Sequence, residues 1–84
     1  LYKRAQRSGT NWKRRYFKLF PDRLTYSVRA NGKEKGKMEF TSEFFVQDGK
    51  AQKGKYGFLV TDFDTSYYLA AETKDEKDFW CHAI

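Results

Sequence analysis

Basic side chains are concentrated in one short stretch of the sequence, Trp12–Leu19, which reads WKRRYFKL. Side chains alternate across a β-strand, so Lys13 and Arg15 would share one face with Phe17 and Leu19. Phe17 and Leu19 suit a core, whereas an unpaired charge is costly to bury. If the strand runs past the edge of the core, both cations lie at its wet rim, where they could bind an anion.

The opposite orientation of this strand fits the same alternation. Trp12, Tyr16 and Phe20 would then face the core, and Lys13 and Arg15 would only be solvated. Periodicity alone does not choose between the two orientations.

Charge is unevenly distributed along the chain, which has 84 residues and a net charge of +6. Residues 1–37 contain 12 Lys or Arg and 2 acidic residues, whereas residues 38–84 contain 5 and 9. This separation indicates a basic face for a polyanion such as lipid headgroups, nucleic acid or an acidic partner. Charge also keeps a small domain soluble, but solubility does not require segregation by sign.

Length and composition predict one small domain over residues 1–84. Aromatic residues make up 19% of the chain, which suits a compact β-rich core. Cys81 is the single cysteine, so a disulfide framework and a cysteine-based zinc site are excluded, and a reducing cytosolic compartment is expected. No metal site or cofactor is expected, and no apolar run approaches the span of a bilayer.

The order of elements predicts a mostly β fold, a seven-stranded barrel or sandwich capped by one C-terminal amphipathic helix. The predicted strands are residues 1–5, 12–20, 23–30, 37–41, 44–47, 56–61 and 66–71. Basic loops are predicted at residues 31–36 and 48–55. The first strand and the helix are expected to be truncated, as in a domain cut from a longer protein.

The C-terminal segment has a helix start signal. Thr73 is the predicted N-cap and Glu76 completes a capping box. An apolar face is predicted at helical spacing from Phe79, Trp80, Ala83 and Ile84. Such a helix would close one end of the barrel and leave the other end free.

These segments together resemble a pleckstrin-homology (PH) domain. Leu1–Arg4, a polar loop and Trp12–Leu19 resemble the start of that family's fold. Leu24–Tyr26 is similar to its third strand, and Lys35–Lys37 to the basic-glycine entry to its fourth strand. Trp80 stands where the family's C-terminal helix carries its signature tryptophan. The resemblance covers almost the whole chain.

The resemblance implies an inositol phosphate site. The implied ligand-binding residues are Lys3, Lys13, Arg15, Tyr26 and Lys35. Arg15 would donate two parallel hydrogen bonds to one phosphate, and the lysines would act as point charges. The hydroxyl of Tyr26 would donate to a phosphate, and Lys35, in the loop before the fourth strand, would close the pocket.

Other basic residues are expected at the rim, where they would meet anionic lipid without specificity: Arg4, Arg7, Arg14 and Lys33. Arg14 lies on the opposite strand face from its neighbours and is therefore expected outside the pocket. Structural roles are expected for Phe17, Leu19 and Trp80.

The function implied is phosphoinositide binding that recruits a larger signalling or trafficking protein to a cytosolic membrane face. The alternative keeps the fold but gives it a protein partner, such as a small GTPase or an acidic peptide.

No catalytic residue is expected. Cys81 and His82 are adjacent on the predicted helix and do not face each other, which argues against a nucleophile pair. Residues 55–59 partly resemble an RNA-binding motif, but Thr61 takes its final aromatic place, so nucleic acid is not expected.

Overall fold

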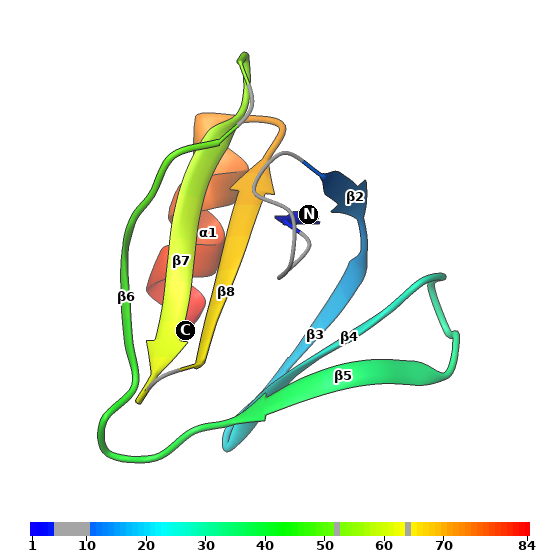
Figure 1. The fold of residues 1–84 in the computed structure, drawn as a ribbon, viewed down its shortest axis with the longest axis vertical. Coiled ribbons are helices and arrows are strands. Elements are labelled where there is room, and N and C mark those ends of the chain that lie inside the picture. Colours follow the sequence, from blue (N-terminus) through cyan, green and yellow to red (C-terminus); the bar gives the residue numbers. More distant parts are fainter. Residues whose placement is uncertain (5–10, 52, 64) are drawn as a thin grey trace.

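The computed structural model describes residues 1–4, 11–51, 53–63 and 65–84. These residues form a sandwich of two antiparallel sheets with one C-terminal helix, α1 (Lys74–Ala83) (Figure 1). The strands are β1 (Tyr2–Arg4), β2 (Trp12–Arg14), β3 (Tyr16–Phe20), β4 (Arg23–Ser27), β5 (Glu34–Glu39), β6 (Phe45–Asp48), β7 (Tyr56–Asp62) and β8 (Thr65–Ala71). The predicted mostly β fold with one terminal helix is confirmed.

Eight strands are present in the described residues, where seven were predicted. The predicted strand over residues 12–20 is broken at Arg15. Its first part, β2, pairs with β1 in the sheet ordered β2-β1-β8-β7-β6, and its second part, β3, joins the sheet ordered β3-β4-β5. At the break, the backbone N–H of Arg15 donates to the carbonyl of Leu1 at 2.9 Å. Alternation cannot reveal such a change of sheet, because the side-chain period continues through it.

Two predicted boundaries around the following loop were wrong. Residues 28–30 were expected in a strand but begin the loop, because Ser27 Oγ and the Gly32 N–H both donate to the Arg29 carbonyl, at 2.6 Å and 2.9 Å. Asn31 has φ 60°, a turn conformation that asparagine tolerates. On the far side, β5 begins at Glu34, so Lys35 lies within a strand and not in the loop before it.

The core lies between the two sheets. Its fully buried side chains include Leu24, Phe58, Val60 and Leu69. Phe17 and Leu19 pack against this cluster, whereas Tyr16 is 39% exposed. The strand therefore has the orientation in which its odd-numbered apolar residues face the core.

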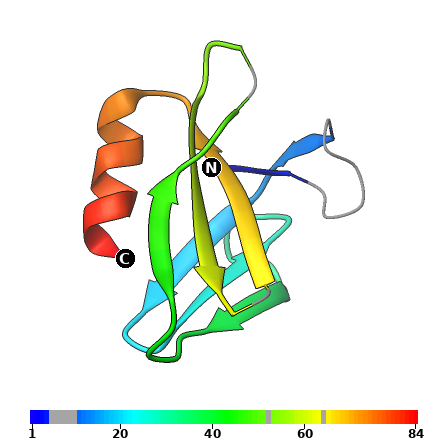
Figure 2. The same ribbon diagram turned by 60° about the vertical axis from the view of Figure 1, so that its left-hand side comes forward.

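The helix begins with the predicted capping box. The Glu76 N–H donates to Thr73 Oγ1 at 3.1 Å, and the Glu76 carboxylate accepts from the Glu72 N–H at 3.0 Å. Helix α1 packs against β7 and β8 on one side of the sandwich (Figure 2). Its Trp80 meets Phe17 of the other sheet edge-on, with 6.5 Å between ring centroids, so the helix contacts both sheets.

The predicted apolar face of this helix was partly wrong. Trp80 and Ile84 pack against the core together with Cys81, but Phe79 is 67% exposed and Ala83 is also exposed. Successive helical residues are about 100° apart, so Phe79 lies off the stripe that faces the sheets. Among the described residues, no helix is long and apolar enough to cross a membrane.

Candidate anion-binding site

Lys3, at the centre of β1, is buried although it carries a charge. Its side chain is 8% exposed. The ammonium Nζ lies 5.0 Å from the ring centroid of Tyr26 and 5.0 Å from that of Tyr67. The carbonyl of Arg4 is 3.5 Å from Nζ, at the long limit of a hydrogen bond. Aromatic faces therefore surround this cation on its buried side.

Lys13 and Arg15 lie beside Lys3. Lys13 is the direct cross-strand partner of Lys3, so both side chains lie on one face of the sheet, and Lys13 is exposed there. Arg15 stands at the break between β2 and β3, half-buried, and its Nη1 donates to the Arg14 carbonyl at 2.9 Å. The break in the strand therefore puts a guanidinium at the corner where the two sheets meet.

Lys35 occupies an irregular position in β5. Tyr26 pairs with Gly36 and Ser27 pairs with Glu34, so the register shift leaves Lys35 without a partner on β4. This is the arrangement of a β-bulge, which changes the direction of a side chain relative to simple alternation. In a regular strand, Lys35 would share a face with Lys37, on the side opposite to the buried Met38. Because of the bulge, simple alternation does not fix the direction of the Lys35 side chain.

Electrostatics connect three of these cations. Burial lowers the pKa of Lys3, and the positive charges of Arg15 and Lys35 lower it further. Within residues 1–4, 11–51, 53–63 and 65–84, the ion pairs join other residues, and none includes Lys3, Lys13, Arg15 or Lys35. The cluster is therefore a concentration of positive charge without a paired carboxylate, which is the condition for attracting an anion.

The aromatic floor of the site is tightly packed. Tyr26 lies 5.5 Å from Phe17 and 5.6 Å from Tyr67, between ring centroids. Burial raises the pKa of Tyr67 to about 12, with smaller contributions from Tyr26 and Glu34. Glu34 therefore lies near this floor, but it forms no ion pair with the cation cluster in the part of the chain that the structure describes.

Two of the expected rim residues lie on the outer face of the five-stranded sheet. The guanidinium of Arg4 stacks on Tyr68, 3.7 Å from its ring centroid, and its Nε is buried without a hydrogen-bond partner among the residues described. Arg14 is exposed and pairs with Tyr2, whose neighbour Lys3 faces inward. Both cations therefore lie on the sheet face opposite to Lys3 and Lys13, and their contact with a membrane stays a prediction. Arg7 lies outside the described residues.

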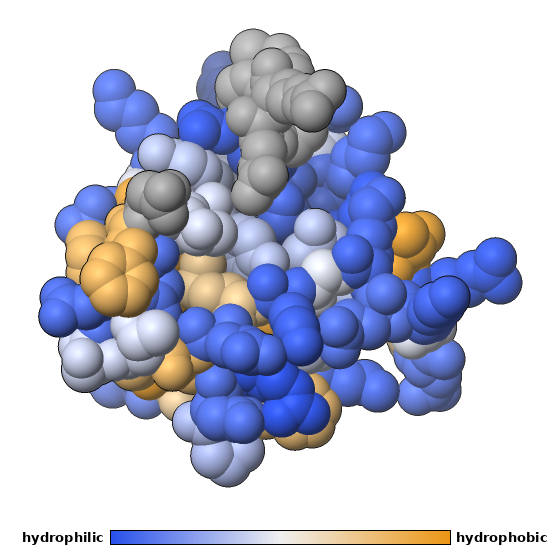
Figure 3. All heavy atoms as spheres, turned by 60° about the horizontal axis from the view of Figure 1, so that its bottom comes forward, coloured by the Kyte–Doolittle hydropathy of each residue, from blue (hydrophilic) through white to orange (hydrophobic). Residues whose placement is uncertain are grey.

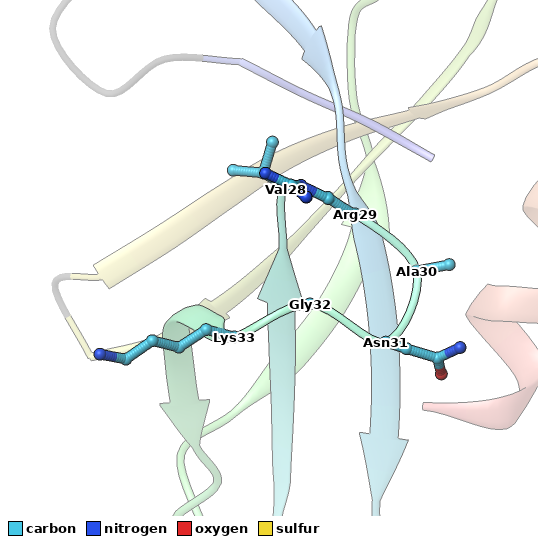
Figure 4. Close-up of a pocket in the computed structure, with 6 residues that line it drawn as sticks. All are labelled: Val28, Arg29, Ala30, Asn31, Gly32 and Lys33. Atoms are coloured by element: carbon cyan, nitrogen blue, oxygen red, sulfur yellow. The ribbon is translucent and has the colours of Figure 1, made fainter.

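The loop between β4 and β5 forms a cavity of about 400 Å³, lined by Val28, Arg29, Ala30, Asn31, Gly32 and Lys33 (Figure 4). Lys33 and Asn31 point in opposite directions from this loop. Arg29 is an exposed cation of this loop that is absent from the predicted site, because residues 28–30 were expected in a strand.

Tyr67 is the second residue that was missed. The sequence Ser66-Tyr67-Tyr68 predicts that one tyrosine faces inward, but not which cation it meets. No group of three or more His, Cys, Asp or Glu that could hold a metal ion occurs among the described residues.

Comparison with known families identifies the class of protein. The chain matches the PH domain family over residues 1–84, and it belongs to that family. PH domains are typically non-catalytic modules that bind lipids or proteins.

One curated relative is a protein of Dictyostelium discoideum named "Guanine exchange factor for Rac 30". It is 30% identical over 80 residues, which cover 92% of this chain but 5% of the relative. The chain therefore spans a small part of the relative's length. No solved structure gave a significant match.

Proposed function

We propose that this PH domain binds the phosphorylated inositol headgroup of a membrane lipid and so recruits a host protein to a cytosolic membrane face. The observation that carries this proposal is that Lys3 lies buried opposite Lys13 and its pKa is lowered by the charges of Arg15 and Lys35, while no ion pair among the described residues includes any of these four cations. Like charges that gather in this way destabilise one another, and a bound polyanion relieves the repulsion.

The members of the proposed site have three kinds of role. Arg15 has a planar guanidinium that can donate two parallel hydrogen bonds to one phosphate. Lys3, Lys13 and Lys35 supply point charges around it, and the Tyr26 hydroxyl supplies a neutral donor. The domain contributes binding and no catalysis.

Exposed cations around the cluster would add non-specific attraction to an anionic membrane. Arg29 and Lys33 lie on the loop between β4 and β5, next to the strands that carry Tyr26 and Lys35. Each basic residue near an anionic surface is worth about 1 kcal/mol. Arg14 is exposed on the other sheet and would contribute only if the membrane also reaches that face.

A protein partner is the second candidate, since the curated relative is named as an exchange factor for Rac. Phe63 and Phe79 are 68% and 67% exposed and could contact such a partner. On the face drawn in Figure 3, however, apolar side chains form separate patches among hydrophilic ones. That face therefore offers no single large apolar patch for a partner, and the cation cluster gives lipid the stronger support.

Vesicle co-sedimentation tests the proposal. Wild type, Arg15→Ala and the matched control Lys18→Ala are compared on phosphatidylcholine vesicles with and without phosphatidylinositol bisphosphate. Lys18 is an exposed cation on the outer face of β3, so its removal changes net charge equally but leaves the cluster intact. We expect Arg15→Ala to lose most of the phosphoinositide-dependent binding, and Lys18→Ala to retain it.

Two results would count against the proposal. Equal binding by wild type and Arg15→Ala would show that the cluster is not the site. Equal loss in both variants would show that only overall charge matters, as for a non-specific cationic surface.

A further inference from the structure

The ammonium of Lys3 contacts the rings of Tyr26 and Tyr67, which also pack against each other. Tyr26 and Tyr67 meet edge-on, with 5.6 Å between centroids and an interplanar angle of 88°. Lys3 Nζ is 5.0 Å from both centroids, within the range of a cation–π contact. Both interactions are strengthened where water is excluded, and Lys3 is 8% exposed.

Tyr67 belongs to the aromatic floor of the site, but its burial leaves it no direct role in binding a headgroup. Its side chain is 5% exposed and belongs to the buried core cluster. The Tyr67 ring contacts the Lys3 ammonium and the Tyr26 ring within this buried cluster. Any influence of Tyr67 on binding therefore acts through its neighbours Lys3 and Tyr26, and a Lys3 variant can separate the two.

We propose that Tyr67, together with Tyr26, is a positioning pair that holds the Lys3 ammonium in place for a phosphate group. The inference rests on the proposed function. A free lysine side chain samples many rotamers, and ordering it on binding weakens affinity. Two ring faces that order Lys3 in the unliganded domain remove that cost beforehand.

The first test compares Tyr67→Phe with Tyr67→Leu. Phenylalanine keeps the ring face and removes the hydroxyl, whereas leucine removes the face. Binding of inositol hexakisphosphate is measured by calorimetry, and binding to phosphatidylinositol bisphosphate vesicles by co-sedimentation. We expect Tyr67→Phe to bind both probes nearly as wild type, and Tyr67→Leu to lose affinity by about threefold or more, the scale of one cation–π contact.

A double-variant cycle separates positioning from general packing. In a Lys3→Met background, Tyr67→Leu should cause no further loss of affinity, because the cation that it orders is absent. The same loss in both backgrounds would overturn the proposal. Equal affinity of wild type, Tyr67→Phe and Tyr67→Leu would also overturn it.

NMR of the wild-type domain keeps the proposal testable if Tyr67→Leu does not fold. The ε-methylene protons of Lys3 should be shifted upfield by the ring currents of the two tyrosines, relative to those of exposed Lys18 and Lys33. An unshifted Lys3 signal would refute the positioning pair. Failure of wild type to bind either probe would instead refute the proposed function, whatever the shift of Lys3.

Discussion

Gly36→Ala should disturb the Lys3 site without touching a charged residue. Gly36 pairs with Tyr26 across β4 and β5, and the tyrosine ring lies over it. A Cβ added at this position would lie 2.6 Å from Tyr26 Cε1 and 2.7 Å from its hydroxyl oxygen. The ring must retreat by about 1 Å to reach an ordinary van der Waals separation.

The Tyr26 ring has little space for this retreat. Phe17 and Tyr67 are packed on it at 5.5 Å and 5.6 Å between centroids, and Lys3 Nζ lies over its face. Overpacking of this kind costs about 1–3 kcal/mol. For a domain of this size, each kcal/mol lowers Tm by about 4–8 °C. The displaced ring would also give up its contact with Lys3, so headgroup affinity should fall as well.

Thermal unfolding and headgroup calorimetry on the same preparations measure both effects. Gly49→Ala is the matched control, because its added Cβ would lie 3.4 Å from the nearest side-chain atom, Leu59 Cδ2, which is an ordinary contact. We expect Gly49→Ala to change Tm and affinity little. If Gly36→Ala had the same Tm and headgroup affinity as wild type, the close approach of the Tyr26 ring to Gly36 would be refuted. The tight packing of Tyr26 against Phe17 and Tyr67 would then be refuted as well.

Three further predictions concern stability. Thr73→Ala removes the oxygen that accepts the Glu76 N–H and should cost about 1 kcal/mol, read as a lower Tm. Asp62→Asn should cost about 1–3 kcal/mol in urea unfolding, because the buried carboxylate accepts 2.7 Å hydrogen bonds from the backbone N–H and hydroxyl of Thr41. The hydrogen bond from the Tyr2 hydroxyl, and then that from Lys55, lower the pKa of Glu72. The ionised Glu72 carboxylate therefore stabilises the fold at neutral pH, and this stabilisation is lost as pH falls through the lowered pKa. Glu72→Gln should therefore be less stable than wild type at neutral pH, with a difference that shrinks on acidification.

Each of these predictions has a control. Thr73→Ser should restore the N-cap, and an unchanged Tm in Thr73→Ala would contradict the capping role. Asp22→Asn alters an exposed carboxylate and should be nearly neutral, so equal effects at Asp22 and Asp62 would argue against a special role for burial. A stability difference between wild type and Glu72→Gln that persists unchanged in acid would contradict the assigned pKa direction.

Local spacing in the sequence was sufficient for the elements that depend on near neighbours. The helix start at Thr73 was predictable because a capping box joins residues three positions apart. The β7–β8 hairpin was predictable because its two strands are adjacent in sequence and rich in strand-forming residues. The order of such elements, with the spaced basic residues, was also enough to identify the PH family resemblance.

Tertiary pairing decided the features that local spacing does not encode. The break at Arg15 exists because β2 and β3 pair with strands of different sheets. The direction of Lys35 depends on a register shift against β4, and the exposure of Phe79 depends on which stripe of α1 meets the sheets. In each case the outcome depends on how one element pairs with or packs against another, which spacing within the element does not specify.

The sequence alone determined that cations are separated from acids along the chain, because residue order fixes the position of each charge. Only the folded structure decided that Lys3 would be buried against two tyrosines, one from β4 and one from β8. The physical reason is that a cation–π contact depends on the relative position of three side chains in space. Those positions are set by the packing of both sheets and not by any local pattern.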